Sequence, residues 1–241
     1  MASQVRLFVD HPLGEGQTVP LTAEQAHYLF SVMRLGEGDV LTVFDGQHGS
    51  WNAQVAQAGK KAGLLRCAGQ TGAQVDPPDL WLLFAPIRKE RTAFIVEKAT
   101  EMGAARIVPV QTAFTNNADR LRHDKLRAYA VEAAEQCGGT YVPEVAPLAR
   151  LADVLRDWPA ERRLMFCDET RRGAASALSA ELAGPWAVLI GPEGGFSPDE
   201  RALLGAMPQS VPVSLGPRIL RADTAVVAAL TVWQQALGDW R

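Results

Sequence analysis

Two stretches near the C-terminus decide the fold of this chain: LIGPEGGFSPDE at residues 189–200 and SLGPRILRADTA at residues 214–225. Each follows a short apolar run, at residues 186–190 and 211–215, which has the length and the large or β-branched side chains of a buried strand. Each also leads into a helical pattern. Because open α/β sheets bind ligands where the carboxyl ends of their strands meet, the two loops predict one composite pocket.

The first loop carries signals for a helix start and for close backbone packing. Ser197, Pro198 and Glu200 have the spacing of an N-cap, a first helical residue and a capping box. The sequence contains neither GxxxxGK[ST] nor GxGxxG, and the Glu193 carboxylate would repel a phosphate at short range. A ligand with a purine edge, a ribose or a positive centre fits this loop better than a bare phosphate. The alternative for the glycines alone is a tight connection that binds nothing.

Strand and helix patterns alternate from residue 77 to the C-terminus, which is typical of a parallel sheet covered by helices. The expected strands before the two loops lie at residues 80–84, 106–110 and 163–166. The expected helices are one ending near 102, one at 119–137, a weak one at 175–183 and a terminal one at 224–237. Apolar positions surround most of the terminal helix, which fits either a dimer contact or full burial within one chain.

The first part of the chain has a different pattern. Short strands are expected at residues 5–9, 40–44, 51–56 and 64–67, separated by glycine-rich turns, with one helix at 22–33. The segment VDPPDL around Asp76 separates the two patterns. We therefore expect two domains: a small β-barrel at residues 1–76 and an α/β domain at residues 77–241.

Several motifs together resemble the SPOUT superfamily of knotted methyltransferases, and in particular its RsmE family. They are the two loops, FIVEKATEMGAARIVPV at 94–110, AAEQCGG at 133–139 and HYLFSVMRLGEGDVLTVFDG at 27–46. The resemblance covers nearly the whole chain, with the motifs in order. It implies a trefoil-knotted parallel-sheet α/β domain, a PUA-like RNA-binding barrel and a homodimer. It also implies methylation of N3 of a uridine in 16S ribosomal RNA, free or in the assembled small subunit, with S-adenosyl-L-methionine as methyl donor.

The resemblance assigns the two loops to the cofactor, through Leu189, Ile190, Gly191, Pro192, Glu193, Gly194, Gly195, Ser214, Leu215, Gly216, Ile219 and Leu220. Arg221 and Asp223, beside the second loop, are the catalytic candidates. Arg221 would stabilise a uracil anion or hold a phosphate, and Asp223 would orient Arg221 or accept a proton. The alternative for Asp223 is an N-cap of the last helix. The RNA-contact candidates are Arg6, Arg34, Arg88, Arg91 and Arg218.

Two positions depart from the family pattern. Asp223 stands where the family usually has Glu, and Gly139 stands where it commonly has Arg. The first change shortens an acidic side chain, and the second removes a cation. These departures leave room for a non-catalytic RNA-binding or ribosome-assembly factor. A methyltransferase for another RNA site is the other alternative, since the cofactor loops do not name the target.

Other charged residues have weaker signals. Glu97 and Glu101 share a helix face, which fits an acid/base pair or an ordinary solvated helix. Glu135 and Gln136 lie at a helix end and are substrate-side candidates. The basic run at 88–91 and the cluster Arg120, Arg122, Lys125 and Arg127 either follow phosphates or are solvated.

Composition limits the class of protein. The net charge is −3, with 24 Lys plus Arg against 27 Asp plus Glu, which excludes a protein that coats nucleic acid non-specifically. The three cysteines form no CxxC pair and are expected to be buried or semi-buried free thiols in a reducing compartment. No signal peptide or membrane-spanning run is found, and the histidines lack metal-ligand spacing. We therefore expect a cytoplasmic protein without a metal.

Overall fold

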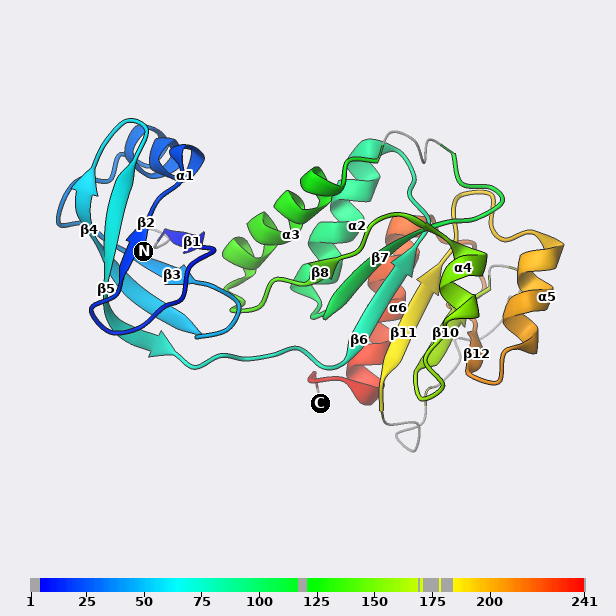
Figure 1. Cartoon of the computed structure of the whole chain (residues 1–241). Coiled ribbons are helices and arrows are strands. Elements are labelled where there is room, and N and C mark those ends of the chain that lie inside the picture. The colour runs from blue at the N-terminus through cyan, green and yellow to red at the C-terminus, as the bar shows by residue number, and fades with distance from the viewer. Residues whose placement is uncertain (1–4, 117–120, 169, 171–177, 179–183, 241) are drawn as a thin grey trace. The chain divides into compact units, whose positions relative to one another are not determined.

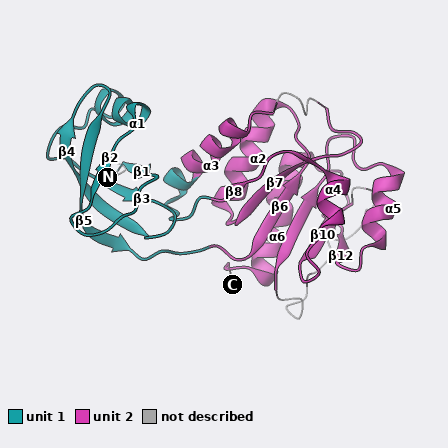
Figure 2. Ribbon diagram, in the orientation of Figure 1, with its two compact units in different colours: residues 1–76, 134–142 teal, residues 77–133, 143–241 magenta. Residues whose placement is uncertain are grey.

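The computed structural model describes residues 5–116, 121–168, 170, 178 and 184–240. The chain divides into two compact units, shown in different colours in Figure 2. The first comprises residues 1–76 and 134–142, and the second comprises residues 77–133 and 143–241.

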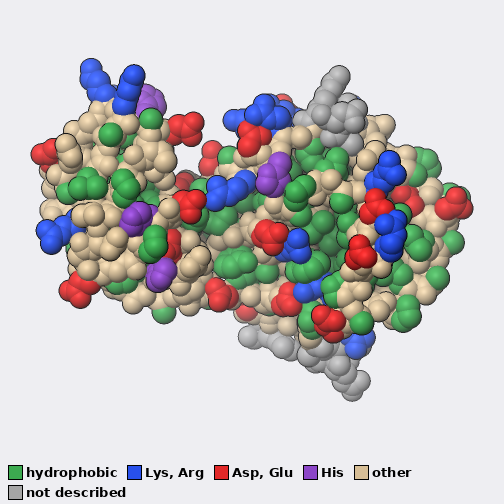
Figure 3. Space-filling view, in the orientation of Figure 1, with side chains coloured by type: hydrophobic (Ala, Val, Ile, Leu, Met, Phe, Trp, Pro, Cys, Tyr) green, Lys and Arg blue, Asp and Glu red, His purple; other side chains and the backbone are tan. Residues whose placement is uncertain are grey.

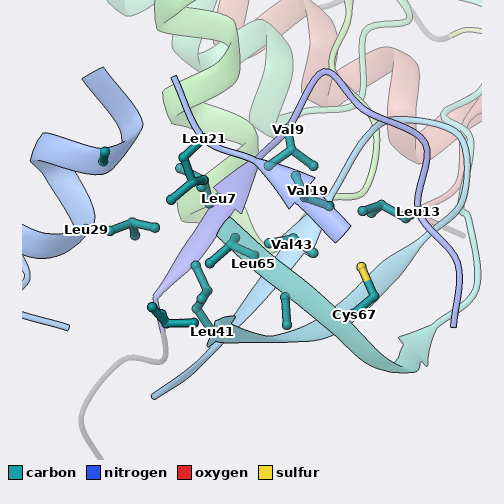
Figure 4. Close-up of a cluster of buried hydrophobic side chains, with 13 residues drawn as sticks. Leu7, Val9, Leu13, Val19, Leu21, Leu29, Leu41, Val43, Leu65 and Cys67 are labelled. Atoms are coloured by element: carbon teal, nitrogen blue, oxygen red, sulfur yellow. The ribbon is translucent and has the colours of Figure 1, made fainter. Parts of the chain in front are cut away.

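The first unit is a curled five-stranded sheet. Its strands, in the order β1-β3-β4-β5-β2, are β1 (Arg6–Phe8), β3 (Val40–Phe44), β4 (Ser50–Ala58), β5 (Gly63–Gly72) and β2 (Thr18–Pro20). Only β1 and β3 pair in parallel. The alternating inward side chains form an apolar core, part of which is labelled in Figure 4. The four predicted strands are confirmed, whereas the short strand β2 was not predicted.

The helix predicted at residues 22–33 is partly correct. The α-helix α1 covers only Ala23–His27, with Thr22 and Gln25 forming a capping box, and the chain continues as a π-helical turn at Tyr28–Val32. Arg34 follows with a φ of 60°. Hydrophobic spacing cannot separate an α-helix from a π-helical turn, because both bury one side of the same short segment.

The second unit contains one sheet in which every strand pair is parallel, so the predicted α/β class is confirmed. The strand order is β12-β10-β11-β6-β7-β8, with β9 also paired to β7. In chain order the elements are β6 (Leu80–Phe84), α2 (Lys89–Glu101), β7 (Arg106–Gln111), α3 (His123–Cys137), β8 (Glu144–Val145), β9 (Ala149–Arg150), α4 (Leu151–Arg156), β10 (Arg163–Cys167), β11 (Trp186–Ile190), α5 (Pro198–Ala206), β12 (Ser210–Val213) and α6 (Ala222–Leu237). The last four residues of α3, 134–137, belong to the first unit.

Helices cover both faces of this sheet (Figure 1). On one face, Leu83 and Leu189 pack with Leu151 of α4 and Leu204 of α5. Helices α2 and α6 contact each other, and α6 packs on β11. All five residues of β11 are buried, as expected for a central parallel strand.

The structure bears on four local expectations from the sequence. The strand predicted at 211–215 ends at Val213, so Ser214 and Leu215 begin the next loop. The last helix begins at Ala222 instead of residue 224. The predicted helix at 175–183 lies outside the described residues, apart from residue 178. Cys67 and Cys167 are buried as expected, but Cys137, the last residue of α3, is exposed, contrary to the expectation.

A buried arginine joins the amino ends of three strands. Arg162, before β10, donates through Nη2 to both Asp79 carboxylate oxygens at 2.8 and 3.0 Å, and through Nη1 to the Trp186 carbonyl oxygen at 2.9 Å. Its guanidinium carbon lies 3.7 Å from the centre of the Trp81 ring. These contacts compensate for burying the charge. Among the helices that the structure describes, none is long and apolar enough to cross a membrane.

Candidate functional site

The register of the sheet brings four strand ends to one edge. Phe84 of β6 pairs with Ile190 of β11, and Cys167 of β10 pairs with Val213 of β12. The loops that follow these strands therefore meet, and they enclose a pocket of about 400 Å³. Its walls are formed by Arg88, Arg91, Cys167, Asp168, Ile190, Gly191, Pro192, Glu193, Gly195, Val213, Leu215, Gly216, Arg218, Ile219, Leu220, Arg221, Ala222 and Ala225.

The structure brings most of the predicted cofactor residues to this pocket. Three do not line it. Leu189 lies in the apolar core, Gly194 faces Phe114, and the Ser214 hydroxyl accepts a hydrogen bond of 3.3 Å from the Gly216 backbone N–H. The sequence interpretation missed five lining residues: Cys167, Asp168, Val213, Ala222 and Ala225. Cys167 and Asp168 directly follow a predicted buried strand. Because ligands bind where the carboxyl ends of parallel strands meet, the sequence contained a signal for these two residues.

The glycines of the first loop are required partly by packing. A Cβ at Gly191 would lie 2.8 Å from the Phe196 ring, which is buried and packs edge-to-face on Phe166 with centroids 5.1 Å apart. Gly195 has a φ of +69° and donates to the Pro192 carbonyl at 2.9 Å, which closes a turn. After the turn, the predicted capping box is confirmed, with mutual Ser197 and Glu200 bonds of 3.2 and 2.8 Å.

Four arginines contribute positive charge to the pocket lining: Arg88, Arg91, Arg218 and Arg221. Arg88 is the N-cap of α2 and Arg221 is the N-cap of α6, so the amino ends of two helices border the same space. Unpaired N–H groups and the helix dipole add partial positive charge at each end. The arginines and the two helix ends therefore favour anionic groups on a bound partner.

Arg91 and Asp223 form an ion pair next to this pocket. The exposed fraction of the Asp223 side chain is 13%, against 35% for Arg91, so the pair is partly shielded from water. Asp223 is not the N-cap, because Arg221 holds that position, but the Asp223 carboxylate does accept a backbone N–H in the first turn, that of Thr224 at 2.9 Å. The carboxylate therefore orients Arg91, whereas the sequence interpretation paired it with Arg221.

The pocket lining also includes acidic and apolar residues. Asp168 accepts hydrogen bonds from the backbone N–H and hydroxyl of Thr170 at 3.0 and 2.8 Å, and it lies 3.6 Å from Arg201. Glu193 is exposed at the loop tip. Burial raises the pKa of the Cys167 thiol to about 12. The thiol is therefore protonated at neutral pH and is a packing group in the wall rather than a nucleophile.

Other candidates do not line this pocket. In the first unit, the Arg6 guanidinium donates to the Gly139 carbonyl at 2.7 Å and lies 5.1 Å from the Phe44 ring centre, and burial lowers its pKa. Glu135 accepts from the Phe8 N–H at 2.9 Å. In the second unit, Glu101 pairs with Lys98 at 2.6 Å. Glu97, Gln136 and Arg34 are absent from the lining of this pocket, and Arg120 lies outside the described residues.

Within the described residues, no three His, Cys, Asp or Glu side chains gather in a group that would hold a metal ion. On the face shown in Figure 3, cationic and anionic side chains are interspersed, in keeping with the near-balanced charge. The four pocket arginines are thus a local feature of the carboxyl edge of the sheet.

Two family models match the sequence. A model described as an RNA methyltransferase domain matches residues 75–234, and one described as an RNA methyltransferase PUA domain matches residues 21–66. The chain is 28% identical over 229 residues to ribosomal RNA small subunit methyltransferase E of Rickettsia conorii, covering 93% of each chain. It is 32% identical over 219 residues to the protein of that name from Synechocystis, covering 88% of this chain and 71% of the relative.

Solved structures agree with these matches. A Neisseria gonorrhoeae ribosomal RNA small subunit methyltransferase E, bound to S-adenosyl methionine, has a TM-score of 0.89 and 26% identity, covering 99% of this chain and 100% of that one. A protein from Legionella pneumophila described as a putative methyltransferase, also in complex with this cofactor, has a TM-score of 0.87 and 28% identity, covering 99% of this chain and 100% of that one.

Proposed function

The chain belongs to the family of ribosomal RNA small subunit methyltransferases E, and from this membership we propose that it methylates N3 of a uridine in 16S ribosomal RNA. As a member, it is an S-adenosyl-L-methionine-dependent methyltransferase of small-subunit ribosomal RNA. The observation that carries the proposal is the pocket at the carboxyl edge of the sheet, where glycine loops, two carboxylates and four arginines meet.

The residues of the pocket fit this cofactor. The volume of about 400 Å³ lies in the range of small-molecule sites, roughly 300–1,000 Å³. Ile190, Leu215 and Leu220 offer apolar surface for an adenine ring, and the loop backbone offers hydrogen bonds to its edge. The Glu193 and Asp168 carboxylates suit the amino group, the ribose hydroxyls and the positive sulfonium. When bound, the cofactor supplies an electrophilic methyl group.

The protein must help to remove the N3 proton and must align the two reactants. Uridine N3 carries a proton at neutral pH, so the nitrogen becomes nucleophilic only as that proton leaves to solvent water. Lowering the N3 pKa by two units requires about 2.7 kcal/mol of preferential interaction with the anion. A charge-assisted bond from Arg221 is of this order, and its guanidinium has no partner among the described residues. Positioning contributes more, up to roughly 7–11 kcal/mol.

The same proposal assigns roles to the other arginines. Arg91, held by Asp223, would present a fixed cation to the target nucleotide. Arg88 and Arg218, exposed at the pocket rim, would contact RNA phosphates. We propose that residues 1–76, with Arg6 and Arg34, bind RNA, and that residues 77–241 bind the cofactor and catalyse transfer, in line with the two matched models.

We also propose that the protein acts as a homodimer with the knotted chain path of the SPOUT superfamily. The family resemblance supports both points. In addition, Val227, Val232 and Leu237 of α6 are only partly buried, which leaves apolar surface on the terminal helix for a second copy. Light scattering after size exclusion tests the dimer, and a monomeric mass at micromolar concentration would contradict it.

The test of the proposed reaction is methyl transfer from labelled S-adenosyl-L-methionine to small ribosomal subunits that lack the modification, followed by nucleoside analysis. We expect 3-methyluridine as the product. Label in another nucleoside would support use of the cofactor as methyl donor but contradict N3 of uridine as the target. A protein that binds the cofactor but labels neither subunits nor naked rRNA would contradict the catalytic proposal.

A further inference from the structure

A second pocket adjoins the first. It has a volume of about 390 Å³ and is lined by Pro86, Ile87, Phe114 and Asn116, together with Arg88, Pro192 and Glu193, which also line the first pocket. The two spaces therefore share a wall formed by the N-cap of α2 and the tip of the first glycine loop. A group bound in the second pocket lies next to the ligand of the first.

Phe114 is the unusual member of this lining. Its exposed fraction is 46%, high for an aromatic side chain within a compact unit. It follows β7 in a turn in which the Thr112 N–H donates to the Thr115 hydroxyl at 2.9 Å and the Thr115 N–H donates to the Thr112 carbonyl at 3.2 Å. The two hydroxyls are 2.8 Å apart. The turn thus holds its own shape without burying the ring.

Two further contacts fix the turn against the cofactor loop. The Ala113 N–H donates at 2.7 Å to Glu200, the residue whose other carboxylate oxygen caps α5. A Cβ at Gly194 would lie 3.2 Å from the Phe114 Cβ, so this glycine leaves the room in which Phe114 lies. Gly194 does not line the first pocket, and its small size is explained by this contact. The turn therefore positions Phe114 beside the first glycine loop and leaves its ring partly open to solvent.

We propose that Phe114 is a stacking platform for the uracil that receives the methyl group, an inference that rests on the proposed function. A ring exposed in a rigid turn suits a flat partner, and RNA-binding proteins stack unpaired bases on aromatic side chains. The amide of Asn116 has a donor and an acceptor for the base edge, and Arg88 has donors for a uracil carbonyl or the adjacent phosphate. Stacking on Phe114 places the base beside the methyl donor, as transfer requires.

The first test is photochemical and does not depend on turnover. Small ribosomal subunits reconstituted with 5-iodouridine-substituted rRNA are bound to the protein, irradiated, and the cross-linked peptide is sequenced by mass spectrometry. We expect a cross-link at Phe114 that Phe114→Leu abolishes. A cross-link confined to other residues overturns the proposal, even if no methyl transfer is detected.

The second test is kinetic, on unsubstituted subunits. Phe114→Ala is expected to lower kcat/KM for RNA about tenfold or more, because base–aromatic stacking is lost. Phe114→Tyr should restore kcat/KM, since the ring is kept. The affinity for S-adenosyl-L-methionine, measured by calorimetry, should not change. Phe94→Ala is the matched control, because Phe94 is also exposed, at 38%, and lines neither pocket.

The outcomes separate the two proposals. A wild-type protein that forms no 3-methyluridine contradicts the proposed function, and the cross-link still decides the role of Phe114. A wild-type protein that forms 3-methyluridine, with Phe114→Ala equally active, overturns the stacking platform alone. Failure of Phe114→Tyr to restore activity, with cofactor binding intact, also counts against stacking.

Discussion

Arg91 at the start of α2 and Asp223 in the first turn of α6 form an ion pair across 132 residues of sequence. The pair joins two helices whose amino ends border the pocket. Replacing either residue with Ala should lower kcat roughly ten- to hundredfold, because the remaining charge loses its orientation. The double variant should be no worse than either single one, which corresponds to a coupling energy of at least about 1 kcal/mol. Single-turnover rates of methyl transfer measure the loss in each single variant and the coupling energy.

Asp223→Glu is the control for this pair, since it keeps the charge and restores the residue that the family usually has. It should retain most of the activity. Additive losses in the double variant would show that the two side chains act separately.

Arg221→Ala should lower kcat about a hundredfold or more, the usual effect of removing one donor to a developing anion. The affinity for S-adenosyl-L-methionine should change little. Arg218→Ala is the comparison: it should raise the KM for RNA and reduce the salt slope of RNA binding by about one. If both variants change only the KM for RNA, Arg221 is a binding residue and the catalytic assignment is wrong.

Gly191→Ala should weaken cofactor binding about tenfold or more. The new methyl group would meet the buried Phe196 ring at 2.8 Å, so either the ring or the loop must shift. Calorimetry with S-adenosyl-L-methionine measures the effect. Gly205→Ala in α5 is the matched control, because a Cβ there meets nothing within 4 Å. That change should be neutral or stabilise the helix by roughly 0.5–1 kcal/mol. Equal cofactor affinity in the two variants would contradict the packing role of Gly191.

Asp79→Ala should destabilise the second unit by about 2 kcal/mol, because it leaves the buried Arg162 charge without its carboxylate. The thermal midpoint should fall by roughly 4–8 °C. Cofactor affinity at 20 °C should be unchanged, since Asp79 lies at the amino ends of the strands. An unchanged midpoint would show that water replaces the carboxylate at no cost.

Because the Cys167 thiol is buried, we expect the free energy of unfolding to fall at alkaline pH. Its pKa is about 12 in the folded state, against 9.0 as the ordinary value. The stabilising contribution is complete below pH 9, and it falls as pH rises towards 12, because the unfolded thiol loses its proton first. At pH 10 the loss of stability is on the order of 1 kcal/mol for this one group. Denaturant unfolding of the wild type and of Cys167→Ala between pH 7 and 10.5 measures it, and equal slopes would contradict the assignment.

The sequence predicted the parts of the site that lie in one loop, and it could not predict their partners from other loops. Strand-end reasoning found the two glycine loops and Arg221, because each follows an apolar run. The pairing of Asp223 with Arg91 depends on how α2 and α6 pack, which local spacing does not encode. Phe114 was missed for the same reason: its position matters only because Gly194, far along the chain, leaves room for it.

The fold shows the same difference between what local sequence pattern predicts and what depends on contacts elsewhere. Periodicity predicted the long strands and helices, while the short strands β2, β8 and β9 and the helix α4 have too few residues for a period to be read. The π-helical turn after α1 and the early end of β12 depend on hydrogen bonding rather than on side-chain pattern. The curled sheet of the first unit is held by inward-facing side chains from strands that are distant in sequence.

The sheet register has a consequence for synthesis of the protein. Leu80 in β6 pairs with Trp186 in β11, and β10 pairs with β12, which begins only at Ser210. Contacts between such distant positions form slowly, because a long loop must close first. On a growing chain, the first strand of this sheet can pair early with β7, but its other neighbour, β11, is made much later. An enzyme acting on the small subunit of the ribosome thus cannot assemble its own pocket until nearly all of it has left the ribosome that makes it.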